Sequence, residues 1–338
     1  MKEGRHVTIK MVADKAGVSK STVSRAIGNY PDISDKTKEK IFSVMKELNY
    51  YPSAIARSLA NRISKNVGLV LPADDDFFLN PFFQESLRII SKTASSRGYD
   101  VLIAYNGDNE TRSVERLVKA NKVDGVIMMR SVVQDPTIEY LRDSNFPFVL
   151  IGKSIDYSSV HSVDTDNVDA CKTLTKKLID SGCKKIAFIG GDKNSVVTID
   201  RFNGYVKTIE ENGMKLNKDL IQENEFSSMN GYRSIEKILK NDSSIDGIVI
   251  TDALIFSGVM DYINNHKSYE TGESSIKIKV IGTFGTGNFQ QNPDIEIINV
   301  DVDSKILGEK SCNTLIDLLE GKDVEMTQIV DYKISNIN

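Results

Sequence analysis

The first 50 residues carry three short stripes of hydrophobic residues, each with the spacing of one face of an α-helix. The stripes consist of Ile9, Val12, Ala13 and Ala16, of Val23, Ala26 and Ile27, and of Ile41, Val44, Met45 and Leu48. A hydroxylated residue precedes each predicted helix, and the side chains of Thr8, Ser19 and Ser34 can accept hydrogen bonds from the first free backbone N–H groups. Gly17 supplies a tight turn between the first two helices. This order of elements is typical of a helix-turn-helix domain, which we place at residues 1–51.

The second predicted helix has a polar and cationic face, as a recognition helix in the major groove requires. Lys20, Ser21 and Arg25 can reach base edges, and Arg25 is suited to a guanine. The other candidate DNA contacts, most of them suited to phosphates, are Thr8, Ser19, Thr22, Ser24, Tyr50 and Ser53. Taken alone, this face also fits an amphipathic helix whose charged side is simply solvated.

We predict that residues 52–62 form a hinge helix between two parts of the chain. Pro52 and Ser53 can open a helix of about two turns, which is too short to be stable alone in water. Such a segment can fold or unfold as a switch. Leu59 could enter a minor-groove base step and kink the duplex, or it could pack against the neighbouring domain.

Beyond residue 66, short runs rich in β-branched residues alternate with stretches that fit helices. The runs that predict strands are NVGLVLP, YDVLIAY, DGVIMM, FPFVLIG, HSVD, KKIAFIGG, DGIVIT, KVIGTF and IEIINVD. Alternation of this kind implies parallel sheets with right-handed crossovers. Because these strands are too many for one sheet with a single core, we expect an α/β region made of two doubly wound subdomains.

Ligands of such folds bind beyond the carboxyl ends of the strands, and this rule selects candidate residues. The residues that follow the predicted strands and carry suitable side chains are Asn80, Phe82, Phe83, Lys153, Asp192, Arg201, Asp252 and Phe284. Aromatic rings that cover an apolar sugar face, together with Asp, Arg, Lys and Asn that bind hydroxyls, suit a carbohydrate. Singly, each phenylalanine could belong to the core and each charged residue could be solvated, so the prediction depends on their convergence on one cleft.

Charge separates the two parts of the chain. The 338 residues carry a formal net charge of -4, yet residues 1–65 hold 13 Lys/Arg against 6 Asp/Glu, a net of +7, and the remainder has a net of −11. A basic head on an acidic body indicates that only the head meets a polyanion.

Several classes of protein are disfavoured. No apolar run is long enough to span a membrane, no secretory signal is visible, and the three cysteines form no CxxC, so we expect a cytoplasmic protein. GTFGTG and FIGGDKNS match no nucleotide-binding motif, and no HExxH or GxSxG is present, so we expect neither an enzyme nor a cofactor. The acidic residues of DTD at 164–166 could hold Mg²⁺, but a loop between subdomains explains them more simply, and we expect no metal.

Three stretches carry a resemblance to a known family: VTIKMVADKAGVSKSTVSRAI, ISDKTKEKIFSVMKELNYYPSAIARSLA and NVGLVLP. The chain resembles the LacI/GalR family of bacterial transcription regulators from Val7 to its C-terminus, and within it the maltose-operon repressors most. The resemblance implies that Lys20, Ser21 and Arg25 read bases and that Leu59 is the wedge in the minor groove. One departure is Met11, where the family usually has an aspartate that completes a capping box with Thr8.

The resemblance also implies a periplasmic-binding-protein-like domain at 63–338 for effector binding and dimerisation. Subdomain one would span about 63–161 and 295–321, and subdomain two about 164–292 and 325–338. Effector contacts would include Phe82, Phe83, Arg201 and Asp252. The run GTFGTG replaces a common acidic motif, so the pocket is a variant of the family's.

We therefore predict a homodimeric repressor that binds a palindromic DNA operator and responds to a small sugar, with maltose or a maltodextrin as the expected effector. A corepressor-dependent regulator and a constitutive DNA-binding protein with a vestigial pocket are the alternatives. A transport protein would lack the basic head, and an enzyme would need catalytic motifs that are absent. Nothing in the residues indicates a phosphocarrier coregulator.

Overall fold

The computed structural model describes residues 7–51, 63–71, 76–105, 111–266, 276–286 and 289–337. The predicted hinge helix at 52–62, with Ser53 and Leu59, lies outside the described residues. The chain divides into two compact units, Met1–Lys65 with Asn121–Asp124, and Asn66–Ala120 with Gly125–Asn338.

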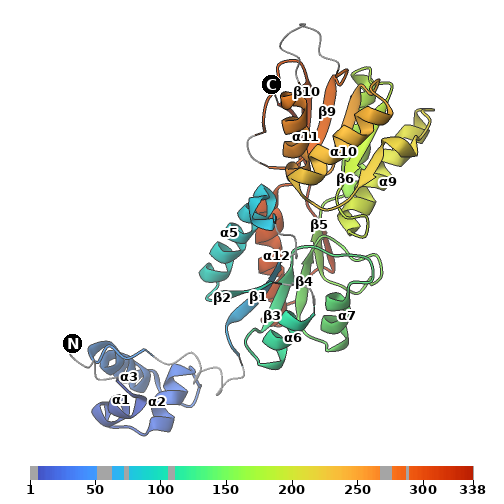
Figure 1. Ribbon diagram of the computed structural model, residues 1–338. Coiled ribbons are helices and arrows are strands. Elements are labelled where there is room, and N and C mark those ends of the chain that lie inside the picture. The colour runs from blue at the N-terminus through green and yellow to red at the C-terminus, as the bar shows by residue number, and fades with distance from the viewer. Residues whose placement is uncertain are drawn as a thin grey trace. The chain divides into compact units, whose positions relative to one another are not determined.

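The first unit contains the three predicted helices, α1 (Ile9–Ala16), α2 (Lys20–Ile27) and α3 (Asp35–Glu47) (Figure 1). Their apolar stripes meet in one core that consists of Val12, Ala13, Ala16, Val23, Ala26, Ile41 and Met45. Gly17 ends α1 with φ +68°, a conformation that glycine adopts without strain. The predicted helix-turn-helix arrangement is confirmed.

Two of the three predicted caps form as expected. The Ser19 hydroxyl accepts a hydrogen bond from the backbone N–H of Thr22 at 3.1 Å, and Ser34 does the same for Thr37 at 3.3 Å. Thr8 occupies the N-cap position of α1, but its side chain makes no capping hydrogen bond, so this prediction is wrong. The Thr8 carbonyl instead accepts from the N–H groups of Met11 and Val12.

The second unit holds two sheets, each covered by helices on both faces (Figure 1). The first sheet has the order β11-β5-β4-β3-β1-β2, and its strands are β1 (Asn66–Leu71), β2 (Asp100–Tyr105), β3 (Gly125–Met128), β4 (Phe148–Ile151), β5 (Ser162–Asp164) and β11 (Thr327–Ile329). Its helical elements are η1 (Phe77–Leu79), α5 (Pro81–Ser96), α6 (Arg112–Lys119), α7 (Pro136–Asp143) and α12 (Ser304–Leu319). Every strand pair in this sheet is parallel, as the alternating pattern predicts.

The second sheet has the order β12-β10-β9-β8-β6-β7. Its strands are β6 (Ile186–Gly190), β7 (Ile221–Glu223), β8 (Gly247–Ile250), β9 (Val280–Phe284), β10 (Glu296–Asp301) and β12 (Lys333–Ile337), with β12 antiparallel to β10. Helices α8 (Asn167–Asp180) and α9 (Val196–Glu211) pack together on one face, and α10 (Ser228–Asn241) and α11 (Ala253–Asn265) pack together on the other, with η2 (Lys218–Leu220) before β7. The two doubly wound subdomains are thus present.

The positions at which the chain crosses between the sheets differ from the expected boundaries. Strand β10 (296–301), expected in subdomain one, pairs with β9 in the second sheet, because Ile297, Ile298 and Val300 complete the buried core there. Strand β11 (327–329), expected in subdomain two, pairs instead with β5 at the edge of the first sheet. The chain therefore crosses after β5, after β10 and after β11.

Among the described residues, no helix combines the length and the apolar character needed to cross a membrane.

Candidate functional site

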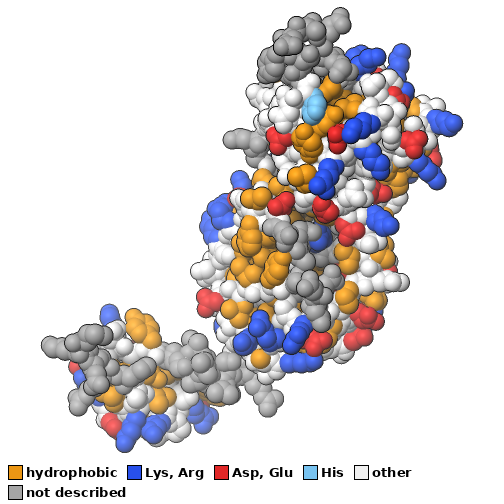
Figure 2. All heavy atoms as spheres, viewed as in Figure 1, with side chains coloured by type: hydrophobic (Ala, Val, Ile, Leu, Met, Phe, Trp, Pro, Cys, Tyr) orange, Lys and Arg blue, Asp and Glu red, His pale blue; other side chains and the backbone are white. Residues whose placement is uncertain are grey.

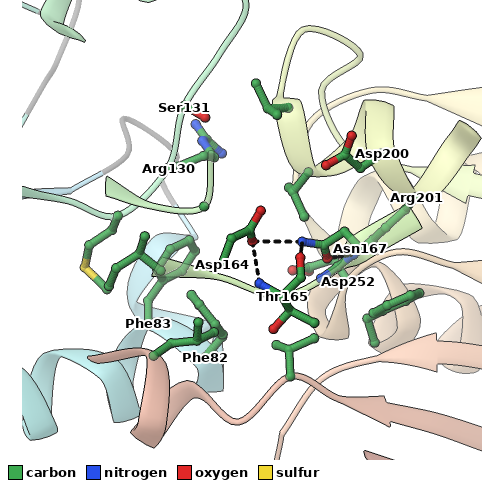
Figure 3. A pocket seen from close by; sticks show the side chains of 18 of the residues that line it. Phe82, Phe83, Arg130, Ser131, Asp164, Thr165, Asn167, Asp200, Arg201 and Asp252 are labelled. Atoms are coloured by element: carbon green, nitrogen blue, oxygen red, sulfur yellow. Dashed lines mark hydrogen bonds between the residues drawn. The ribbon is translucent and has the colours of Figure 1, made fainter. Parts of the chain in front are cut away.

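A pocket lies in the second unit where elements of both subdomains converge (Figure 3). The space that it outlines is about 890 Å³, and part of this space is open to solvent. The residues that line it are Asn80, Phe82, Phe83, Met129, Arg130, Ser131, Ile151, Gly152, Lys153, Asp164, Thr165, Asn167, Val196, Val197, Asp200, Arg201, Phe226, Asp252, Ala253, Phe284, Gly285, Val302 and Leu307. Most of these follow the carboxyl end of a strand or begin a helix, as the rule for open α/β sheets requires.

Seven of the eight residues selected from the sequence line this pocket. The exception is Asp192, which does not line it, so that part of the prediction is wrong. Its Oδ1 atom accepts a hydrogen bond from the backbone N–H of Asn194 at 2.9 Å, and the residue thereby shapes the turn between β6 and α9. The first lining residues after this turn are Val196 and Val197 at the start of α9.

The strand-end rule also selects residues that were not among the predicted effector contacts. Arg130 and Ser131 follow β3, Asp164 ends β5 and Thr165 follows it, and all four residues line the pocket. Asn167, Asp200 and Phe226 give a weaker signal, because they lie on α8, on α9 and in the loop before α10 rather than directly after a strand.

Arg201 on α9 is held from several sides. Its Nε donates to Asn167 Oδ1 at 2.9 Å, one terminal nitrogen donates to the Thr251 carbonyl, and its Cζ lies 3.9 Å from the centroid of the Phe284 ring. Burial lowers the pKa of Arg201 to about 10, so the side chain stays charged at neutral pH. Asn167 in turn donates to Asp164 Oδ1 at 3.1 Å, which connects Arg201 to the end of β5 (Figure 3). The result is a rigid cation in the pocket wall.

Asn80 and Asp252 meet across the pocket. Asn80 Nδ2 donates to Asp252 Oδ2 at 2.6 Å. Each residue also caps a helix, because Asn80 Oδ1 accepts from the Phe82 N–H at 3.0 Å and Asp252 Oδ1 accepts from the Leu254 N–H at 2.7 Å. Burial raises the pKa of Asp252, and these hydrogen bonds oppose that rise. One contact therefore joins α5 of the first subdomain to α11 of the second.

A second link across the pocket is an ion pair. Lys153 Nζ lies 2.8 Å from Asp200 Oδ2; the Asp200 side chain is buried and that of Lys153 is 41% exposed. Burial raises the pKa of Asp164 to about 6, and the nearby Asp200 carboxylate adds to the rise. Lys153 also connects to Ser131, whose Oγ donates to the Lys153 carbonyl at 2.6 Å. The segment after β3 then pairs with the start of α9 through a bridge between Val132 and Ser195.

Aromatic rings form the apolar part of the lining. Phe82 and Phe83 are partly buried, pack edge to face with centroids 5.2 Å apart, and also contact the core. These two rings thus serve the core and the pocket together. Phe284 and Phe226 line the pocket from the second subdomain.

The charges of the pocket are balanced. The lining contains three basic residues, Arg130, Lys153 and Arg201, and three acidic ones, Asp164, Asp200 and Asp252. All of them except Lys153 are labelled in Figure 3. Such a lining offers many hydrogen-bond donors and acceptors without an excess of either charge, which suits a neutral polyhydroxylated ligand.

The carboxylates of the acidic segment at 164–166 accept hydrogen bonds from nearby backbone N–H groups. Asp164 accepts from the Thr165 N–H, and Asp166 caps α8 by accepting from the Asp169 N–H. In the part of the chain that the structure describes, no group of three His, Cys, Asp or Glu residues could hold a metal ion.

The first unit presents the candidate DNA contacts at its surface. Lys20, Ser21, Ser24 and Arg25 are exposed along α2, and Lys and Arg side chains lie on the visible face of this unit (Figure 2). The remaining described candidates differ in exposure: Thr8 and Ser19 are exposed, whereas Thr22 and Tyr50 are half-buried. Tyr50 packs against the core of the unit.

Two family models match the chain. Residues 8–53 match "Bacterial regulatory proteins, lacI family", and residues 64–336 match "Periplasmic binding proteins and sugar binding domain of LacI family". The transcriptional regulator MalR of Streptococcus pneumoniae serotype 4 is 37% identical over 337 residues, which cover 97% of this chain and 98% of the relative. MalR of Staphylococcus xylosus is 30% identical over 324 residues, covering 94% and 93%.

Solved structures share the fold. The Lac repressor dimer bound to operator and the anti-inducer ONPF has a TM-score of 0.77 at 22% identity and covers 98% of both chains. The complex of the transcriptional regulator CelR with cellobiose has a TM-score of 0.72 at 23% identity, covering 97% of this chain and 98% of the other.

Proposed function

The chain belongs to the LacI family of bacterial regulatory proteins, and from this premise we propose that it is a repressor controlled by a neutral sugar. It would bind a palindromic operator as a homodimer, with one α2 helix in each half-site. The observation that carries the sugar part is the pocket between the subdomains, with its phenylalanine rings and its balanced charges.

The charge balance favours a neutral sugar over a phosphorylated one. A phosphate would meet Arg130, Lys153 and Arg201, but it would also face Asp164, Asp200 and Asp252 in the same lining. Lys153 is already paired with Asp200, so a phosphate would have to break that pair and leave a buried carboxylate without it. The relatives named MalR support maltose or a maltodextrin as the effector.

Coupling to DNA would follow from the contacts that join the subdomains. The hydrogen bond between Asn80 and Asp252 and the ion pair between Lys153 and Asp200 each link one subdomain to the other, and both border the ligand space. A sugar that rearranges these contacts binds one arrangement of the subdomains more tightly than another, which shifts the equilibrium between them. Reversing operator occupancy requires a preference of about 5 kcal/mol. A corepressor would use the same contacts with the opposite sign.

The test is a thermal-shift screen of the full chain against maltose, maltotriose, cellobiose and maltose 6′-phosphate. A sugar at 100 times its Kd adds about 2.7 kcal/mol to the free energy of unfolding, which gives a clear rise in Tm. Arg201→Lys keeps the charge but loses the planar fork, so it should reduce the shift, whereas Asp192→Asn lies outside the lining and should retain it.

The outcomes separate the alternatives. A shift with a neutral sugar, together with release of an operator duplex in fluorescence anisotropy, supports the proposal. A shift accompanied by tighter DNA binding supports a corepressor. No shift with any sugar would leave a constitutive DNA-binding protein with a vestigial pocket as the better account.

A further inference from the structure

An acidic side chain lies against Arg25, the residue of the first unit that we propose as a base reader. Asp32, in the loop between α2 and α3, places its Oδ2 atom 2.8 Å from a terminal nitrogen of Arg25. Both side chains are about half exposed, at 51% for Arg25 and 47% for Asp32. A carboxylate at a surface that meets phosphates is repelled by them, so its presence there calls for a compensating role.

The same loop holds the arginine from a second side. The Arg25 Cζ lies 5.3 Å from the centroid of the Tyr30 ring, and the Tyr30 N–H donates to the Arg25 carbonyl at 3.0 Å. The ring lies so close to Gly28 that a Cβ at that position would be 2.8 Å from it. Asn29, at φ +55°, accepts a hydrogen bond from Lys38 Nζ at 2.8 Å. The loop is thus folded back over the end of α2.

This arrangement restricts a side chain that is otherwise free to rotate. An exposed arginine loses rotamer entropy when it binds a base edge, and a partner that holds it beforehand lowers this cost. The guanidinium has five N–H donors, so one can bond to Asp32 while others are available for a bidentate contact with a guanine.

We propose that Asp32 is a positioning residue for DNA recognition, which holds the Arg25 guanidinium in the orientation that reads a base pair. The proposal rests on the proposed role of Arg25 as a base reader. It makes two predictions of opposite sign for the loss of the Asp32 charge. Discrimination at the base pair that Arg25 reads should fall, while affinity for DNA of unrelated sequence should rise.

The experiment uses the full-length protein and a duplex library with randomised positions, from which bound sequences are selected and counted. Arg25→Ala first identifies the base-pair position that Arg25 reads. Asp32→Asn should then lower the preference at that position by about threefold to tenfold, the amount expected from losing one pre-ordered side chain. Asp32→Glu, which restores the carboxylate, should recover a large part of the preference.

Asp14→Asn is the matched control. Asp14 is an exposed residue on α1, so this substitution removes the same charge without touching the contacts of Arg25. It should leave the base preference unchanged. Binding of a scrambled duplex, measured by anisotropy at low salt, should strengthen about twofold to fivefold in Asp32→Asn, because one repulsive charge is removed.

Each result has a clear meaning. If Arg25→Ala changes no base preference, the proposed base-reading role of Arg25 is wrong. If Arg25→Ala alters one position but Asp32→Asn leaves that position as in the natural chain, Asp32 does not position Arg25 and this inference is overturned. An equal loss in Asp32→Glu and Asp32→Asn would also overturn it.

Discussion

Asp164 at the end of β5 should destabilise the folded chain above pH 6, and Asp164→Asn should relieve that cost. The side chain is buried, with 8% of the residue exposed, and its Oδ1 accepts from the Thr165 N–H at 2.8 Å and from Asn167 at 3.1 Å. An asparagine can retain these hydrogen bonds through its own carbonyl oxygen. The substitution therefore removes the charge and keeps the local geometry.

The magnitude follows from the pKa. Burial raises the pKa of Asp164 from 3.8 to about 6, with Lys153 and Arg201 opposing the rise. Between these two values the folded state holds the proton more tightly than the unfolded state does, so stability falls as the pH rises and the full cost applies above pH 6. A rise of about two pKa units corresponds to about 3 kcal/mol. Only about 1 kcal/mol of this cost is present at pH 4.5.

The assay is urea unfolding of the natural chain and of Asp164→Asn at pH 4.5 and pH 7.5, followed by circular dichroism. At pH 7.5 the variant should be more stable by about 1–3 kcal/mol, and this gain should shrink by about 2 kcal/mol at pH 4.5. Asp180→Asn, at an exposed position paired with Lys176, should show no comparable gain. A gain of the same size at both pH values, or a loss at pH 7.5, would refute the reasoning.

Three further predictions concern single contacts. Lys153→Met should lower the free energy of unfolding at pH 7.5 by about 1–3 kcal/mol, because it leaves the buried Asp200 carboxylate without its cation. The double variant Lys153→Met with Asp200→Asn should recover most of this loss in urea unfolding. Ser34→Ala should lower the free energy of unfolding of the first unit by about 1 kcal/mol. Thr8→Ala should lower it distinctly less, because the Thr8 side chain makes no capping hydrogen bond, and equal losses would contradict the observed caps. Gly258→Ala on α11 would place a Cβ 1.8 Å from a backbone carbonyl oxygen of α10, so we expect the free energy of unfolding in urea to fall by several kcal/mol. A stability within about 0.5 kcal/mol of the natural chain would show that α10 and α11 can move apart without cost.

Local patterns in the sequence were sufficient for the elements and for most of the pocket. The apolar stripes of α1, α2 and α3 determine both the helices and the core between them, since one face of each must be buried. The rule for strand ends selected Arg201 and Asp252 without knowledge of the fold, because parallel strands bring their carboxyl ends to one edge. Both properties depend on neighbours in the chain.

The tertiary structure decided which distant residues meet. Nothing in the sequence indicates that Asn80 bonds to Asp252, that Lys153 pairs with Asp200, or that Asp32 holds Arg25. Packing also decided that β10 joins the second sheet, where its apolar side chains are buried beside β9. Hydrophobic and polar periodicity determines what each segment becomes, whereas a contact between side chains depends on how whole elements pack, and burial then sets the charge and pKa of groups such as Asp164.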